Sequence, residues 1–209
     1  MLVRAAVLER PGERLAIHSL DVGPPLAGQV LVKVLFSGVC RSQLMEVQGK
    51  RGTDPWLPHL LGHEGSGIVE AIGAGVSKVR PGDAVILTWI KGEGLDAPGG
   101  FFQRNGERIN AGPVTTFSDY TVVSENRLVH KPPGLDFDLA VLFGCALPTG
   151  GGMVMNELDV GPGSTAIVLG LGGVGLSALM TLRAVQVALR HWREGDSPLT
   201  RVNVEGRHQ

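Results

Sequence analysis

The stretch Gly62-His63-Glu64-Gly65-Ser66-Gly67-Ile68-Val69-Glu70-Ala71-Ile72 joins a potential metal ligand, His63, to a short apolar run that is typical of a strand. Three further runs of similar length are rich in valine: Gln29–Val34, Asp83–Leu87 and Asp119–Val123. Turn signals such as Pro81-Gly82-Asp83 separate these runs. Many short strands with turns between them predict a compact β barrel or sandwich. We expect the polar, glycine-rich segment Lys91–Thr116 to be a long surface loop.

The composition of the chain excludes several classes of protein. Of 209 residues, 43% are hydrophobic and 19% charged, and 19 Lys and Arg against 20 Asp and Glu leave a net charge of -1. Intrinsic disorder is therefore excluded, and we expect neither a nucleic-acid partner nor a basic membrane-binding surface. Two cysteines are too few for a disulfide-stapled secreted scaffold. Because we also find no signal peptide at the N-terminus, we expect a cytoplasmic protein.

The second part of the sequence changes in character after about Leu147. The glycines of Thr149-Gly150-Gly151-Gly152 predict a hinge before a helix that runs toward Leu158. The uncharged stretch Ser164–Leu182 is about long enough to span a bilayer. Its four glycines favour a buried strand, a tight turn and a buried helix instead, with a membrane span as the alternative. The polar end, Arg193–Gln209, is typical of a frayed tail.

A glycine-rich turn lies in a context that favours nucleotide binding. Gly170-Leu171-Gly172-Gly173-Val174-Gly175 follows the predicted buried strand Thr165–Leu169 and opens a helix that should continue to about Trp192. In this context G-x-G-x-x-G permits a sharp turn and the close approach of a pyrophosphate to a helix N-terminus. The acidic residue expected about twenty residues later, at the end of a second strand, is absent. A glycine turn that binds nothing is the alternative.

Three residues form a candidate metal centre: Cys40, His63 and Cys145. Two thiolates and one imidazole suit Zn²⁺, and three protein ligands with an open fourth position are typical of a catalytic zinc. Each residue also has an ordinary interpretation, as a small buried thiol or a structural histidine. The spacings are too long for a local metal motif, so the residues alone leave both interpretations open.

Several motifs in order resemble the zinc-containing alcohol dehydrogenases of the medium-chain dehydrogenase/reductase superfamily. They are Gly38-Val39-Cys40-Arg41-Ser42, Gly62–Gly67 continuing to Gly73 and Val76, Pro81–Val85, Thr116–Val123 and Gly170–Leu176. The likeness extends over about Met1–Ala184. It implies a mixed α/β chain in which a GroES-like β-rich catalytic domain occupies 1–148. The beginning of a Rossmann dinucleotide-binding domain would follow at 149–192, with a tail foreign to the family at 193–209.

The resemblance also implies roles for individual residues. Cys40, His63 and Cys145 would bind zinc, with Glu64 as a neighbouring carboxylate and Ser42 relaying the alcohol proton. The remaining implied contacts are with NAD or NADP through Arg41, Thr149, Gly170, Gly172, Gly173, Val174 and Gly175, and with the substrate through Trp89. A core aromatic is the alternative for Trp89. Met45 stands where many relatives continue the proton relay with histidine.

Two departures from the family change what is expected. Lys91–Thr116 lacks the four cysteines of the family's structural zinc, so we expect one zinc ion per chain. After Ala184 the second Rossmann strand is absent, which indicates a truncated or frame-shifted chain and leaves NAD and NADP undistinguished. Relatives commonly assemble as homo-oligomers through the Rossmann sheet edge, but we do not expect assembly of this chain.

Three hypotheses about function follow. The first is an oxidoreductase that interconverts a small alcohol and an aldehyde or ketone with zinc and NAD(P). The second is a non-catalytic zinc-binding fragment of such an enzyme. The third is a zinc-free quinone or enoyl reductase of the same superfamily, which would make the presence of both cysteines and His63 coincidental.

Overall fold

The computed structural model describes residues 1–158, 160, 164 and 166–192, with side chains described as far as 185. The chain divides into two compact units, Met1–Cys145 and Ala146–Gln209. The predicted tail at 193–209 lies outside the described residues. Among the described helices, no single one is long and apolar enough to cross a membrane. One bent pair, Phe137–Gly144 with Ala146–Glu157, meets the length and composition criteria together.

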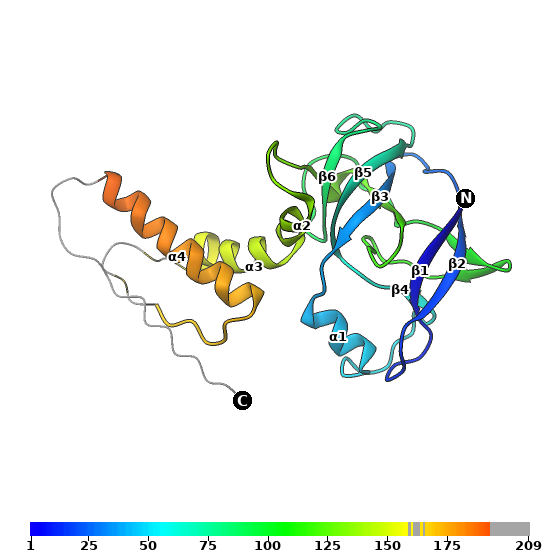
Figure 1. Cartoon of the computed structure of the whole chain (residues 1–209), viewed down its shortest axis with the longest axis horizontal. Coiled ribbons are helices and arrows are strands. Elements are labelled where there is room, and N and C mark those ends of the chain that lie inside the picture. Colours follow the sequence, from blue (N-terminus) through cyan, green and yellow to red (C-terminus); the bar gives the residue numbers. More distant parts are fainter. Residues whose placement is uncertain (159, 161–163, 165, 193–209) are drawn as a thin grey trace. The chain divides into compact units, whose positions relative to one another are not determined.

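The first unit is built from two five-stranded sheets, ordered β4-β1-β2-β7-β8 and β10-β6-β5-β3-β9 (Figure 1). All of their ladders are antiparallel. The strands are β1 (Leu2–Leu8), β2 (Ala16–Val22), β3 (Gln29–Ser37), β4 (His59–Leu60), β5 (Glu64–Ile72), β6 (Ala84–Thr88), β7 (Phe102–Arg104), β8 (Glu107–Ile109), β9 (Tyr120–Ser124) and β10 (Leu128–His130). The helices are α1 (Arg41–Val47), α2 (Phe137–Ala140) and two 3-10 turns, Glu125–Arg127 and Val141–Gly144. The predicted β-rich first part of the chain is confirmed.

The continuous apolar run in β3 is explained by burial on both faces of its sheet. Successive side chains of a strand point to opposite faces. Leu31 accordingly packs in one core cluster with Val122 of β9, whereas Val30 and Val32 pack in a second cluster with Val123. Because each face contacts a core over Val30–Val32, this part of the strand is continuously apolar and lacks the polar alternation of a half-exposed strand.

The prediction of a surface loop at Lys91–Thr116 is wrong in its middle, where β7 and β8 form a hairpin. Arg104 pairs with Glu107, and the two residues between them, Asn105 and Gly106, have φ values of 52° and 83°. Asn-Gly favours this tight turn because both residues tolerate positive φ. Phe102 and Ile109 are fully buried on the hairpin's inner face, so the segment contributes to the core.

The second unit contains α3 (Ala146–Gly152), a π-helical turn (Met153–Glu157) and α4 (Gly173–Trp192). The hinge predicted at 149–152 is wrong, because these residues lie in α3. A Cβ on Gly150 would lie 2.2 Å from the carbonyl oxygen of Val174 and 2.8 Å from the Cβ of Ser177. The Ser177 hydroxyl donates to the carbonyl of Leu147 at 2.7 Å. The glycine therefore serves the close packing of α3 on α4.

The buried strand predicted at Thr165–Leu169 is not observed. In the described part, 166–169, only Ile167 forms an isolated bridge, and Ile167 and Leu169 are 67% and 82% exposed. Ala166 and Val168 pack beside the small apolar cluster of this unit. A parallel strand is stable only with neighbouring strands and cover on both faces, which the described residues do not supply. The helix predicted to follow, as far as Trp192, is confirmed as α4.

Candidate metal centre and cofactor loop

The fold brings three side chains of the first unit together: Cys40, His63 and Cys145. One ligand atom from each lies within 4.8 Å of the other two, so all three lie no more than about 2.8 Å from a common point. Cys40 directly precedes α1, His63 directly precedes β5, and Cys145 follows the 3-10 turn Val141–Gly144. Zinc bonds of about 2.3 Å to sulfur and about 2.0 Å to nitrogen require only small side-chain adjustments from this arrangement.

The chemistry of His63 fits a metal ligand. Its Nε2 atom is buried and has no hydrogen-bond partner among the described residues. Burial lowers the pKa of His63 below its ordinary value, and the charge of Arg51 lowers it further. A neutral imidazole offers a lone pair to a metal. The two cysteines form no disulfide, so both are in the reduced state that metal binding requires.

Two further predicted residues lie beside the metal ligands. The Ser42 hydroxyl donates to the sulfur of Cys40 at 3.3 Å. Glu64 is only 4% exposed at the start of β5, next in sequence to His63. A Cβ on Gly38 would lie 2.6 Å from the Cγ, Cδ and Oε1 atoms of Glu64. The bare backbone at Gly38, two residues before Cys40, therefore makes room for the carboxyl group.

Threonine hydroxyls that the sequence analysis did not single out hold the ligand-bearing segments in place. Thr116 Oγ1 donates to the carbonyl of Glu64 at 2.9 Å, and the Thr116 amide donates to the carbonyl of Leu61 at 3.0 Å. Thr88 Oγ1 donates to the carbonyl of Gly144, beside Cys145, at 2.7 Å. Both threonines are buried, and each satisfies a backbone carbonyl next to a candidate ligand. Thr88 ends β6 and Thr116 lies outside the strands, and neither position carried a sequence signal for these hydrogen bonds.

Trp89 and Arg41 are both accessible. Trp89 follows directly on β6 and is 49% exposed, which contradicts the alternative of a core aromatic. Arg41 is exposed as the first residue of α1. Met45, on the same helix, is 37% exposed. The accessible side chains of Trp89 and Arg41 are compatible with contacts to small molecules.

The predicted cofactor residues of the second unit lie in the turn that leads into α4. Gly170 has a φ of 88°, and a Cβ on Gly175 would lie 2.0 Å from the Gly170 carbonyl oxygen. The amide of Leu176 donates to the carbonyl of Gly172 at 2.9 Å. Gly173 and Val174 form the first helical positions, and Thr149 lies within α3 of the same unit. A tight glycine turn before a long helix leaves backbone N–H groups that can bind an anion.

A family model and a curated protein both show that this chain is similar to alcohol dehydrogenases. The family model for the alcohol dehydrogenase GroES-like domain matches residues 26–133. The chain is 34% identical to alcohol dehydrogenase 6 of Peromyscus maniculatus, with 88% of this chain and 56% of that protein covered. The chain therefore spans about 56% of the length of this curated relative.

Solved structures resemble this chain to a similar extent. An alcohol dehydrogenase zinc-binding domain protein from Burkholderia ambifaria has a TM-score of 0.79, and benzyl alcohol dehydrogenase from Acinetobacter calcoaceticus has one of 0.75. Each is 29% identical, over 88% of this chain and 56% of the other. A quinone oxidoreductase from Pseudomonas syringae, 23% identical over 89% of this chain and 51% of its own, has a TM-score of 0.71 and shares the fold alone.

Proposed function

Because the chain belongs to the alcohol dehydrogenase family with a GroES-like domain, we propose that it is a zinc-dependent oxidoreductase that interconverts a small alcohol and its carbonyl compound with NAD(P). The observation that carries this proposal is the convergence of Cys40, His63 and Cys145, together with a His63 Nε2 atom that is buried and has no hydrogen-bond partner among the described residues. That donor set fits one zinc ion with a vacant ligand position. We propose this as the single zinc site of the chain, without a structural zinc.

Cys40, His63 and Cys145 would hold the metal. When bound, zinc would polarise the substrate oxygen and lower the pKa of a bound alcohol, as it lowers that of bound water to about 7. The neutral state of His63 and the reduced state of both cysteines are what such binding requires. Glu64, buried beside Gly38, would orient the ligand set through its carboxylate.

Ser42 would move the proton. Its hydroxyl already lies at the Cys40 sulfur, and a serine hydroxyl can accept one proton while it donates another. Met45 cannot continue such a relay, because a thioether carries no exchangeable proton. We therefore propose that the proton leaves Ser42 through water. Trp89 would contribute an apolar wall to the substrate pocket.

The cofactor would be held by Arg41, by Thr149 and by the glycine turn Gly170–Gly175. Backbone N–H groups at the start of α4 would bind the pyrophosphate, which needs no side chain at these positions. NAD(P), when bound, supplies the hydride acceptor. The residue that would distinguish NAD from NADP follows a second Rossmann strand, which the sequence up to Ala184 does not contain.

A non-catalytic zinc-binding fragment is the second candidate function. The observation that favours it is the absence of a strand among described residues 166–169, which leaves the glycine turn without its supporting sheet. Under either function we propose a cytoplasmic location, because the two cysteines must stay reduced. Neither function requires a nucleic acid, a membrane or a second copy of the chain.

The test combines zinc loading with cofactor binding on the full chain. We expect one zinc ion bound through Cys40, His63 and Cys145, NADH fluorescence that saturates on titration, and alcohol oxidation that His63→Asn abolishes. His130→Asn is the matched control, because His130 is 56% exposed and outside the cluster. Zinc binding without any NADH binding at millimolar cofactor would establish the fragment instead. Quinone reduction by zinc-free protein would overturn both in favour of a zinc-free reductase.

A further inference from the structure

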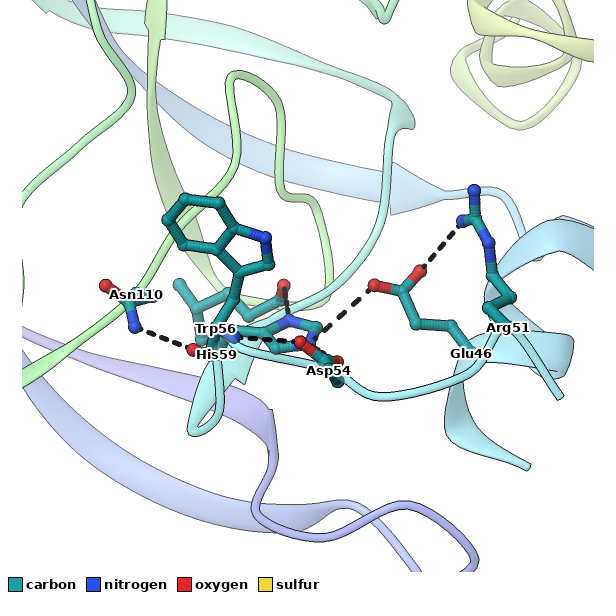
Figure 2. Close-up of polar contacts among 7 residues, drawn as sticks. Glu46, Arg51, Asp54, Trp56, His59 and Asn110 are labelled. Atoms are coloured by element: carbon teal, nitrogen blue, oxygen red, sulfur yellow. Dashed lines mark hydrogen bonds and ion pairs between the residues drawn. The ribbon is translucent and has the colours of Figure 1, made fainter. Parts of the chain in front are cut away.

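A second group of metal-binding side chains lies apart from the cysteines in the first unit: Glu46 on α1, Asp54 in the following loop and His59 at the start of β4. One ligand atom from each lies within 4.8 Å of the other two. Figure 2 shows both carboxylates directed at one edge of the His59 ring. The Nε2 atom of His59 lies 2.8 Å from Asp54 Oδ2 and 3.7 Å from Glu46 Oε1.

The hydrogen bonding of His59 restricts what can occupy this space. Its Nδ1 atom lies 2.9 Å from the carbonyl oxygen of Leu60, which can only accept, so Nδ1 carries a proton. Nε2 faces two carboxylates, which also only accept when ionised. Nε2 must therefore carry a second proton or direct its lone pair at a cation that it shares with the carboxylates. A backbone acceptor on the other ring nitrogen is the usual arrangement of a metal-bound histidine.

Asp54 is held in a fixed position. Its Oδ1 atom accepts a hydrogen bond from the Trp56 amide at 2.9 Å, and its Oδ2 atom lies 2.8 Å from His59 Nε2. The Asn110 side chain donates to the Trp56 carbonyl at 2.6 Å (Figure 2). The Leu60 amide donates to the Asn110 carbonyl at 2.9 Å. These bonds preorganise the loop that carries Asp54.

A cavity of about 410 Å³ adjoins the cluster and is lined by Gln43, Glu46 and His59, among others. Gln43 is 7% exposed, and its Oε1 atom has no hydrogen-bond partner among the described residues. Gln43 and Glu46 are three residues apart on α1 and therefore share one face of the helix.

We propose that Glu46, Asp54 and His59 bind one divalent metal ion. The ligand set of two carboxylates and one imidazole favours an ion such as Mn²⁺, whereas the two thiolates of the other cluster favour zinc. Ligand atoms bound at about 2.1 Å lie at most about 4.2 Å apart, so small movements of the carboxylates complete the site. The cavity beside Glu46 and His59 has room for water ligands.

One positive charge must move when the ion binds. Arg51 lies 3.4 Å from Glu46 Oε2 and is 58% exposed, so its guanidinium can turn into solvent. An exposed ion pair of this kind is weak, and the attraction of a divalent ion to two carboxylates readily exceeds it. Arg51→Gln should therefore tighten Mn²⁺ binding severalfold.

The test is a titration of the full chain with Mn²⁺, followed by the loss of the free-ion electron paramagnetic resonance signal. We expect one Mn²⁺ per chain, with equal affinity in Cys40→Ser/Cys145→Ser, which lacks the thiolates. Asp54→Asn and Glu46→Gln should each weaken binding at least tenfold. Glu9→Gln is the matched control, because Glu9 also pairs with a histidine, His18, at 2.9 Å, but beside Arg104 instead of a second carboxylate.

A second readout does not depend on the stability of a variant. In wild-type protein, bound Mn²⁺ should broaden the ring-proton resonances of His59 beyond detection while those of His130 persist. Absence of saturable binding at millimolar Mn²⁺ would overturn the proposal. Equal affinity in wild type and Glu46→Gln would do the same. Either result would leave His59 and Asp54 as a hydrogen-bonded pair that binds no metal ion.

Discussion

Replacing Gly38 with alanine tests whether Glu64 packs against the backbone just before Cys40. The new Cβ would lie 2.6 Å from three atoms of the Glu64 side chain, whereas ordinary contacts are 3.4–4 Å, so the carboxyl group must move by about 1 Å. Overpacking of this kind costs about 1–3 kcal/mol. A displaced supporting group beside a metal typically weakens metal binding by about 10–100-fold. We expect losses of this size in unfolding free energy and zinc affinity.

The two losses are measured separately, by urea denaturation of metal-free protein and by competition for zinc with a chromophoric chelator. Gly23→Ala is the matched control, because no heavy atom lies within 4 Å of a Cβ at Gly23. That control should be neutral or more stable by about 0.4–1 kcal/mol, since alanine restricts the unfolded chain. The reasoning is refuted if Gly38→Ala matches Gly23→Ala in both measurements.

Three further changes test other parts of the structure. Glu125 is 1% exposed and accepts three backbone N–H groups at 2.6, 2.6 and 2.7 Å, so Glu125→Gln should lower the unfolding free energy at pH 7 by about 2–4 kcal/mol in urea titrations. Burial raises the pKa of Glu125, but the three N–H groups lower it more, so the pKa lies below its ordinary value of 4.5. The stabilisation by the Glu125 carboxylate is therefore fully present above pH 4.5. As the pH falls below 4.5, the difference in unfolding free energy between wild type and Glu125→Gln should become smaller. A gap that stays constant down to pH 3 would contradict this. Ser42→Ala should reduce kcat by about 10²-fold or more with unchanged zinc content, and an unchanged kcat would exclude Ser42 from the relay. Gly106→Ala should cost about 1 kcal/mol or more, because the turn holds φ at 83°, and a neutral effect in thermal unfolding would argue against the β7–β8 turn.

The strands that could be predicted from the sequence are those whose side chains are buried on one or both faces throughout. Gln29–Val34 is an example, since a valine-rich run needs no knowledge of its neighbours. The hairpin at Phe102–Ile109 was missed although Asn105-Gly106 is a strong local turn signal, because the flanking strands are only three residues long. β2 was missed because the polar His18 lies on the same face as the buried Leu20 and Val22, while the apolar Ile17 lies on the exposed face, which obscures the alternation.

The metal centre illustrates the limit of local reasoning. Cys40, His63 and Cys145 are far apart in the sequence, and long-range contacts such as the pairing of β3 with β5 and the bond from Thr88 to Gly144 bring their segments together. The residue types made these three residues candidates, and the resemblance to a family implied their common role before any geometry did. The cluster around His59 was missed altogether, because the residues and the family motifs gave no signal for it, and its members meet only after the chain reverses between α1 and β4.

In the second unit, the local sequence pattern predicted a strand that the described residues do not form. The apolar run at 165–169 has the composition of a buried strand, but a parallel strand depends on partners from elsewhere in a chain. α4 forms as predicted because a helix satisfies its own backbone hydrogen bonds.

The central claim is that Cys40, His63 and Cys145 share one zinc ion. Crystals of the zinc-loaded chain, measured on both sides of the zinc absorption edge, test it most directly. The account predicts a strong anomalous peak about 2.3 Å from both sulfurs and about 2.0 Å from His63 Nε2. Zinc-loaded crystals without a peak at these three atoms would contradict it.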